Sequence, residues 1–285
     1  MAAVTGSSTS TAASGSGMFM CMHGITSSGS DFRAVMEGWS RAGIAYAEPD
    51  LVSARTFEQA NGEGSARRLM DDLGIRAVSS TNQLFLEETG PRRAQALEDL
   101  KWKVVMAQSL GADRLVAPSA ANQSHTIADY DEVMDNLREA AEIARPHNVT
   151  LMVEFTRLST LINNLRTAME VVRAVNHPNL RFMLDVYHFW AGMSKFEDLD
   201  LVEHGEIHHV HFADTPALPH LAVAERKDRA FPGEGIAPLQ KIVDKLAEKG
   251  YSGPLSLELF DPAVQNADPE TIARKGIETT RPFIS

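Results

Sequence analysis

The sequence has one cysteine, Cys21, among its 285 residues. A single thiol excludes an intrachain disulfide and any zinc site built from several cysteines of one chain. Runs of about 18 apolar residues are also missing, so the sequence predicts no membrane-spanning helix. Positive charge is scarce: 27 Lys and Arg stand against 38 Asp and Glu, which gives a net charge of -11. Such an acidic chain is a poor candidate for binding nucleic acid or an anionic membrane. Because there is only one cysteine, any bound metal must be held by carboxylates and histidines.

The rest of the composition is that of an ordinary globular protein, with 44% hydrophobic and 23% charged residues. Residues 1–17 differ, because nearly all of them are Ala, Ser, Thr or Gly. Such a segment buries too little apolar surface to order itself. It also lacks the basic start and the apolar middle of a secretory signal. We therefore expect a disordered tail over 1–17, a single folded domain over 18–285 and a cytoplasmic protein.

Short apolar runs alternate with longer amphipathic segments along the rest of the chain. The apolar runs cover 19–26, 44–49, 75–80, 113–120, 149–155, 180–187, 207–214 and 254–260. Each is followed by a helical pattern, at about 31–43, 56–73, 90–110, 129–145, 159–175, 195–204, 237–249 and 268–281. Strands that alternate with helices indicate a parallel sheet, and eight such units match a closed (β/α)8 TIM barrel. The rival is an open doubly wound sheet, but HGITSSGS after the first run is not a glycine-rich phosphate loop.

Four of the apolar runs end in a residue that titrates. These residues close the fifth to eighth predicted strands and are Glu154, Asp185, His211 and Glu258. The carboxyl ends of barrel strands open into one mouth, so we expect these side chains to converge there. Burying a carboxylate without compensation costs several kcal/mol. Arg181, at the start of its strand, is the only cation in the four runs, so a bound divalent metal would resolve the conflict.

Each of the four residues also has a simpler explanation when it is taken alone. A single acidic residue near a strand end often caps a loop or pairs with a basic residue, and a single buried histidine is usually hydrogen-bonded in the core. The joint pattern favours a metal site, because equivalent positions on four successive strands are involved. Three carboxylates and one imidazole suit Mn²⁺, Mg²⁺ or Co²⁺ better than a structural zinc ion.

Further polar residues follow the strands closely enough to line the same mouth. His188, just past the sixth strand, is either a hydrogen-bond donor to a ligand or an ordinary loop histidine. Arg229 lies in DRAFPGEG, where Pro and Gly predict a tight turn, and is either a clamp for a ligand oxygen or a solvated arginine. Asp214 is expected to orient a ligand or Arg229. His23 and Glu48, at the ends of the first two strands, are weaker candidates for lining the pocket.

These pieces resemble the xylose isomerase-like TIM barrels, a family of sugar isomerases and epimerases that includes ketose 3-epimerases, hydroxypyruvate isomerases and inosose dehydratases. The resemblance rests on VEF, LDVYH, HVHFAD, RAFPGEG and GYSGPLSLELF, in this order over roughly 149–260. It implies one divalent metal ion bound by the four strand-end residues, Glu154, Asp185, His211 and Glu258. It also implies that His188 and Arg229 bind the substrate.

The resemblance further implies an enzyme acting on a small-molecule sugar or polyol, and it leaves open whether the chain forms a homo-oligomer. The acidic net charge and the lack of long apolar runs predict no nucleic acid or membrane partner. Removal of the proton next to the substrate carbonyl would give a metal-stabilised enediolate. Glu154 and Glu258 would form the acid/base pair: return of the proton to the opposite face gives epimerisation, and return to the neighbouring carbon gives isomerisation. The alternative is a dehydratase of a keto-cyclitol or similar carbonyl compound, which expels a β-hydroxyl group.

Two functions from other classes fit the sequence less well. Apurinic endonucleases share this barrel family, but they need additional histidine ligands and a basic face for the nucleic acid backbone, and the net charge of -11 counts against them. A sugar-binding barrel without catalytic activity would not need two glutamates placed as an acid/base pair. We therefore expect a metal-dependent isomerase or epimerase, with the dehydratase as the second reading.

Overall fold

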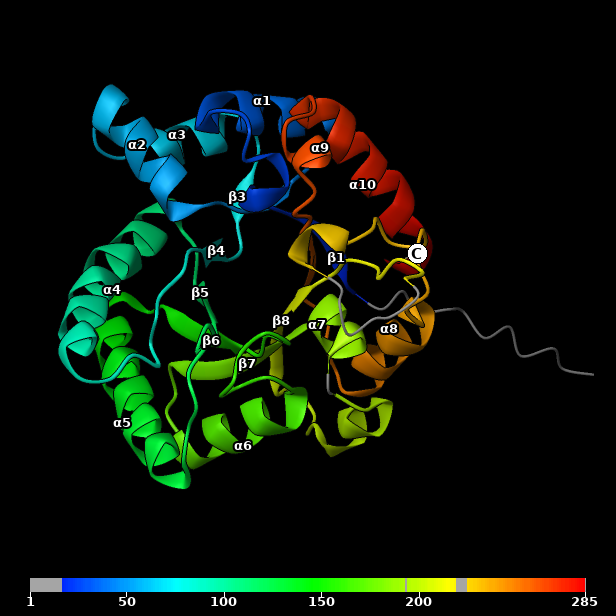
Figure 1. Ribbon diagram of the computed structural model, residues 1–285. Helices are drawn as coiled ribbons and strands as arrows, with labels where there is room; N and C mark the ends of the chain where they lie inside the picture. The colour runs from blue at the N-terminus through cyan, green and yellow to red at the C-terminus, as the bar shows by residue number, and fades with distance from the viewer. Residues whose placement is uncertain (1–16, 193, 219–224, 285) are drawn as a thin grey trace, which may run out of the picture.

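Parallel strands form the centre of the molecule (Figure 1). The structure is a computed structural model and describes residues 17–192, 194–218 and 225–284. The strands in these residues are β1 (Phe19–His23), β2 (Tyr46–Glu48), β3 (Arg76–Ala77), β4 (Ser80–Thr81), β5 (Arg114–Pro118), β6 (Thr150–Glu154), β7 (Leu180–Asp185), β8 (Ile207–His211) and β9 (Pro254–Leu257). Their order in the sheet is β3-β2-β1-β9-β8-β7-β6-β5-β4.

The sheet closes into a barrel because β3 and β4 together fill one strand position. β3 pairs with β2, and β4, which follows after two residues, pairs with β5. The amide of Val78 also donates to the carbonyl of Ala47 at 3.0 Å, and the amide of Thr81 donates to that of Pro49 at 3.2 Å. The eight-fold TIM barrel that the sequence predicts is therefore confirmed. The tail expected over 1–17 lies outside the described residues, apart from Gly17.

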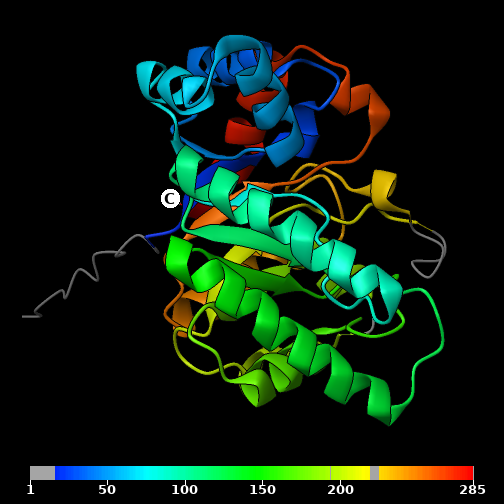
Figure 2. The same cartoon turned by 90° about the vertical axis from the view of Figure 1, so that its left-hand side faces the viewer.

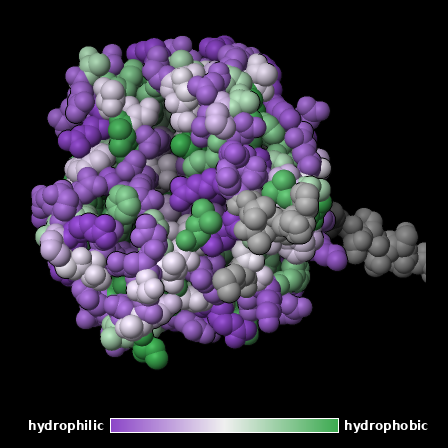
Figure 3. All heavy atoms as spheres, viewed as in Figure 1, coloured by the Kyte–Doolittle hydropathy of each residue, from purple (hydrophilic) through white to green (hydrophobic). Residues whose placement is uncertain are grey.

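Helices surround the sheet, and Figure 2 shows α4 and α5 side by side along its outer face. The helices are α1 (Phe32–Ala42), α2 (Leu51–Asn61), α3 (Ser65–Asp72), α4 (Pro91–Leu110), α5 (Ile127–Ala144), α6 (Leu165–Val175), α7 (Val186–Ala191), α8 (Leu239–Glu248), α9 (Pro262–Gln265) and α10 (Pro269–Ile284). The surface seen in Figure 3 is mainly hydrophilic, with apolar residues scattered over it. None of the helices in the described residues combines the length and the apolar character that crossing a membrane requires.

The second helical segment differs from the sequence-based expectation. The apolar pattern predicts one helix over roughly 56–73, but the chain forms α2 and α3 there. The break lies at Gly62 and Gly64, which have φ angles of 93° and 70°. A left-handed conformation is open to glycine and cannot continue a right-handed helix, so the two residues end α2 and start α3 at a new angle.

The segment after β7 also differs. The sequence predicts a weak helix over 195–204, where the chain forms the 3-10 helix Phe196–Leu201. α7 is not predicted, and it starts directly at the end of β7. The carboxylate of Asp185 caps it by accepting a hydrogen bond from the amide of His188 at 2.6 Å. One aspartate therefore ends a strand, starts a helix and faces the barrel mouth.

Strand alternation decides which side chains point into the barrel. Successive residues of a strand face opposite sides, so residues two apart share a face. Val116, Met152 and Met183 form a small apolar cluster separate from the main core. Glu154 and Asp185 lie two residues beyond Met152 and Met183, on the same faces of β6 and β7. This alternation places apolar side chains deep in the barrel and titrating side chains at its mouth.

Candidate metal and substrate site

The four predicted strand-end residues meet in one buried cluster. Each offers a ligand atom, and these atoms all lie within 4.8 Å of one another: Glu154, Asp185, His211 and Glu258. The imidazole lies at the centre, with Nδ1 at 3.2 Å from Glu154 Oε1 and 3.3 Å from Glu258 Oε2. Asp185 Oδ2 is 3.6 Å from the same nitrogen. The convergence that the sequence predicts is therefore present, because four adjacent strands end at the same rim.

A cation from a loop also lies in this cluster. Nη1 of Arg229 is 2.8 Å from Asp185 Oδ2 and 2.5 Å from Glu258 Oε2, and its side chain is buried. The guanidinium lies over the rings of Tyr187 and Phe260, at 4.8 and 5.0 Å from their centroids. A search for charged residues within the four apolar runs could not reveal this ion pair, because Arg229 lies in a loop after β8. The three carboxylates are thus already partly compensated by a fixed positive charge.

Burial and neighbouring charges pull the pKa values of the two glutamates apart. Burial raises the pKa of Glu154 to about 7, which the nearby His211 only partly offsets. Burial acts in the same direction on Glu258, but Arg229 and then His211 lower the pKa of that carboxyl to about 2. Burial alone would lower the pKa of His211, yet the surrounding carboxylates raise it well above its usual value. Near neutral pH the cluster therefore contains an ionised Glu258, a Glu154 ready to exchange a proton, and a charged imidazole.

The donor set fits a divalent cation. Three carboxylates and the imidazole of His211, which releases its Nδ1 proton when it binds, form an oxygen-rich set of the kind that Mn²⁺, Mg²⁺ and Co²⁺ accept. None of the described residues donates a hydrogen bond of normal geometry to Glu258 Oε2, although Arg229 lies close to it, so this buried oxygen keeps a free lone pair. Net negative charge remains as well once Glu154 is ionised, because three carboxylates then face one guanidinium and one imidazolium. A bound cation would satisfy both the free lone pair and the excess charge.

His188 lies beside the cluster, as the sequence predicts. It is buried in α7, and burial lowers its pKa to about 3, so its ring is neutral. Nε2 lies 3.1 Å from Nη2 of Arg229, and Nδ1 lies 3.3 Å from the amide of Arg157. Both ring nitrogens therefore face N–H donors, whereas a neutral imidazole can accept at only one of them. The shorter contact, with Arg229, is the better hydrogen bond.

Asp214 holds the loop that carries Arg229. Its carboxylate accepts hydrogen bonds from four backbone amides, at 2.7 to 3.0 Å: those of Thr215, Gly233, Gly235 and Ala237. The predicted tight turn also needs its glycines, since a Cβ on Gly235 would lie 2.3 Å from the carbonyl oxygen of Thr215. Of the two roles that the sequence leaves open for Asp214, the structure favours orienting Arg229 through its loop.

Glu48 and His209 matter more than the sequence suggests. Glu48 is fully buried at the end of β2, and it accepts hydrogen bonds from His209 Nε2 at 2.7 Å, His211 Nε2 at 3.2 Å and Ser256 Oγ at 2.8 Å. Because Nε2 of His211 is held by Glu48, Nδ1 is the nitrogen that faces the three carboxylates. The sequence signal was present, since Glu48 ends an apolar run as Glu154 does, but β2 is only three residues long.

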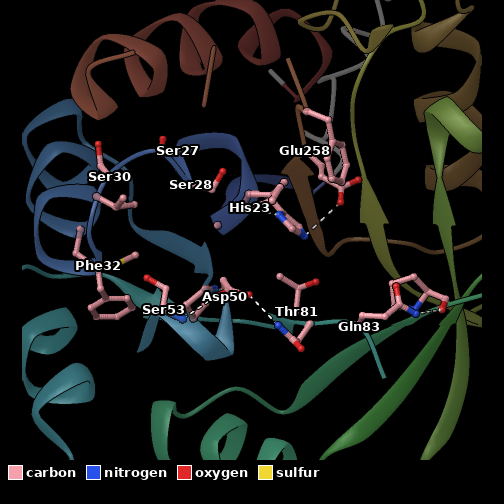
Figure 4. Close-up of a pocket in the computed structure, with 18 of the residues that line it drawn as sticks. His23, Ser27, Ser28, Ser30, Phe32, Asp50, Ser53, Thr81, Gln83 and Glu258 are labelled. Atoms are coloured by element: carbon pink, nitrogen blue, oxygen red, sulfur yellow. Dashed lines mark hydrogen bonds and ion pairs between the residues drawn. The ribbon is translucent and has the colours of Figure 1, made fainter. Parts of the chain in front are cut away.

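A cavity of about 340 Å³ opens beside Glu258. Figure 4 shows His23 and Glu258 directed toward one another at its edge, with Asp50 and Thr81 on the opposite wall. The polar lining consists mainly of hydroxyl and amide groups, from four serines, Thr81, Asn82 and Gln83. Arg226 is the one cation among the described residues that line the cavity, and it is exposed. The lining thus suits a neutral molecule with many hydroxyl groups.

Comparison with known proteins agrees with this geometry. The sequence matches the family described as xylose isomerase-like TIM barrel over residues 39–283. An inosose isomerase from Halalkalibacterium halodurans is 34% identical over 150 residues, which are 52% of this chain and 53% of that protein. A 3-dehydroshikimate dehydratase from Pseudomonas putida is 28% identical over 242 residues, which are 83% of this chain and 37% of that protein. The matched regions thus span about half and about a third of these relatives.

Solved structures share the fold. The crystal structure of an IOLI protein with a bound zinc atom has a TM-score of 0.86 and 23% identity, and the match covers 94% of this chain and 98% of that one. The resemblance noted in the sequence is therefore confirmed. Since the family match covers most of the chain and the strands close into the expected barrel, the chain belongs to the xylose isomerase-like TIM barrel family.

Proposed function

We propose that this protein is a divalent-metal-dependent isomerase or epimerase of a keto-sugar or related polyol, with Glu154 and Glu258 as its acid/base pair. One observation carries the proposal: these two buried carboxyls meet Asp185 and His211 in a cluster whose ligand atoms all lie within 4.8 Å of one another, and Arg229 lies against Glu258 at 2.5 Å, which lowers the pKa of Glu258 while burial raises that of Glu154. Two carboxyls whose environments drive their pKa values apart are the usual arrangement for an acid and a base in one site.

The cation belongs at the four-residue cluster in this proposal. Mn²⁺, Mg²⁺ or Co²⁺ would be held by Glu154, Asp185, His211 and Glu258. When bound, such an ion supplies Lewis-acid stabilisation of negative charge on the substrate carbonyl oxygen. Zinc is named for the IOLI structure, whereas the oxygen-rich donor set of this chain favours the harder ions.

The two glutamates then divide the proton transfers. Glu258 is ionised at neutral pH and borders the cavity, so it can remove the proton from the carbon next to the carbonyl. Glu154, on β6 rather than β9, holds or releases a proton near neutral pH and can return one. Return to the opposite face of the same carbon is an epimerisation, and return to the neighbouring carbon is an isomerisation. His188 and Arg229 would hold the oxygens on which charge develops.

The cavity supports a neutral substrate without a phosphate group. Its hydroxyl and amide lining matches the hydrogen-bonding pattern of a polyol, and Asn82 donates to Asp50 at 3.1 Å within that wall. A phosphate ester would need more than the exposed Arg226 to balance its charge. The match to an inosose isomerase points the same way, because an inosose is a cyclic polyol with one ketone.

A dehydratase is the second candidate, and the match to a 3-dehydroshikimate dehydratase over 83% of this chain favours it. The first step would be the same removal of a proton next to a carbonyl by Glu258. The reaction would then continue by loss of a hydroxyl group from the next carbon, for which Glu154 can supply the proton. A carboxylate-bearing substrate would have to use Arg226 at the cavity as its counter-ion.

Hydrogen exchange distinguishes these reactions. The protein is incubated with Mn²⁺ in ²H₂O together with ketoses and keto-cyclitols, and the products are followed by NMR and mass spectrometry. We expect deuterium at the carbon next to the carbonyl in at least one polyol, and an isomer with no loss of water. A product lighter by one water would favour the dehydratase. A metal-loaded protein that exchanges no proton in any of these compounds would contradict both reactions.

A further inference from the structure

A buried histidine, His23, lies at the edge of the cavity beside Glu258. His23 is the last residue of β1, is only 2% exposed, and lines the cavity together with Glu258. Figure 4 shows its ring directed at Glu258. The ring also meets that of His211 edge to face, with the centroids 4.9 Å apart. His23 therefore borders both the four-residue cluster and the cavity.

The backbone sets which nitrogen of His23 carries the proton. The 3-10 helix Gly24–Ser27 follows β1 directly, and the amide of Ile25 donates to Nδ1 of His23 at 3.0 Å. A nitrogen that accepts a hydrogen bond is unprotonated, so a neutral His23 must carry its proton on Nε2. Nε2–H is thus a donor with a fixed direction.

This donor has no hydrogen-bond partner among the described residues. Its neighbours are two carboxylate oxygens, Glu258 Oε1 at 3.4 Å and Glu48 Oε1 at 3.6 Å, and neither contact has hydrogen-bond geometry. Glu48 Oε1 already accepts from His211. A buried N–H group without a partner is destabilising, and such groups in native proteins call for an explanation, such as a ligand that completes them.

The position of His23 relative to Glu258 is also fixed. Thr26, in the same 3-10 helix, donates through Oγ1 to the carbonyl of Leu257 at 2.8 Å and accepts from the amide of Leu259 at 3.0 Å. These two residues flank Glu258 on either side. The loop that orients the histidine is therefore tied to the segment that carries the glutamate.

We propose that His23 is a catalytic residue that donates a hydrogen bond from Nε2 to the substrate oxygen next to the carbon whose proton Glu258 removes. The ligand is the carbonyl or hydroxyl oxygen of a keto-polyol, so this inference rests on the proposed function. A donor with a preset direction stabilises the charge that develops on that oxygen. The rival reading is that His23 binds the cation, since His23, His211 and Glu258 also form a group able to hold one.

Two substitutions separate the functions of the two nitrogens. His23→Asn keeps an acceptor near the position of Nδ1, so it can still cap Ile25, but it does not reach the position of Nε2. His23→Gln places an amide N–H group near Nε2 and gives up the cap. We expect the His23→Asn variant to fold normally and to lose about 10²- to 10³-fold in kcat, with a smaller change in KM. The His23→Gln variant should keep more of the activity, even where its melting temperature is lower.

The outcomes that contradict the inference are distinct from those that contradict the proposed function. Elemental analysis after incubation with Mn²⁺ should give the same metal content for wild type and both variants, and loss of metal from either variant would make His23 a cation ligand instead. Wild-type turnover together with an Asn variant within about threefold of it would overturn the catalytic role of His23 alone. Wild-type protein that binds metal but turns over no keto-polyol would overturn the proposed function and the inference with it.

Discussion

Replacing Glu154 by Gln tests the electrostatic description of the cluster without requiring any activity. The pKa of Glu154 rises from 4.5 to about 7 on folding because the carboxyl is buried. The folded state therefore holds this proton more tightly than the unfolded state, so its stabilising contribution is complete below pH 4.5 and is lost as the pH rises through 7. At roughly 1.36 kcal/mol per pKa unit, ionising Glu154 in the folded protein costs up to about 3 kcal/mol.

The Gln side chain cannot ionise, and it keeps a carbonyl oxygen that can accept from His211. In cation-free buffer containing a chelator, we expect the stability of the Glu154→Gln variant relative to wild type to increase between pH 5 and pH 8, by up to about 3 kcal/mol. Urea unfolding followed by tryptophan fluorescence at several pH values measures this difference. A difference that does not change with pH, or one that falls toward pH 8, would refute the reasoning.

Adding Mn²⁺ should offset most of this gain at pH 8. A cation that binds only the folded state stabilises it by about 2.7 kcal/mol at one hundred times its dissociation constant, and the variant has lost one carboxylate ligand. Glu87 provides a matched control, because burial also raises its pKa and it lies outside the four-residue cluster. Glu87→Gln should show a pH-dependent gain of the same sign, and Mn²⁺ should stabilise that variant as much as wild type.

Three further substitutions test other contacts of the site. Glu258→Gln should lower turnover at least about 10²-fold while the fold survives, and near-wild-type turnover would remove this residue from the acid/base pair. Glu48→Gln should weaken cation binding by about 10- to 100-fold in calorimetric titrations, because Glu48 orients His211 through Nε2; unchanged affinity would show that this hydrogen bond is dispensable. Asp214→Ala removes the acceptor of four backbone amides. It should lower the free energy of unfolding by at least about 3 kcal/mol, and a loss below about 1 kcal/mol would mean that water replaces the carboxylate.

Much of the barrel could be predicted because parallel strands that are buried on both faces consist of short apolar runs in the sequence. The exception is the third strand, which is divided into β3 and β4, and the break between α2 and α3 depends on the backbone angles of Gly62 and Gly64. The spacing of apolar side chains does not reveal such backbone angles. The fold class was therefore readable from the sequence, whereas helix boundaries were not.

The residues of the candidate site were predictable only where a short stretch of sequence marks them. A charged residue at the end of an apolar run is visible in the sequence, and this revealed the four-residue cluster. The hydrogen bond from His209 to Glu48 joins residues 161 positions apart, so no local pattern contains it. The same holds for the contact of Arg229 with Asp185 and for the orphan nitrogen of His23, because both depend on how loops fold back over the barrel mouth.

The central claim is that four side chains at the mouth of the barrel hold one divalent cation between them. Elemental analysis of dialysed protein, after incubation with Mn²⁺, tests it most directly when wild type is compared with the His211→Ala and Asp185→Ala variants. We predict about one ion per wild-type chain and a loss of most of it from each variant that remains folded. Wild-type protein without a bound ion, or variants that retain the same amount as wild type, would contradict the claim.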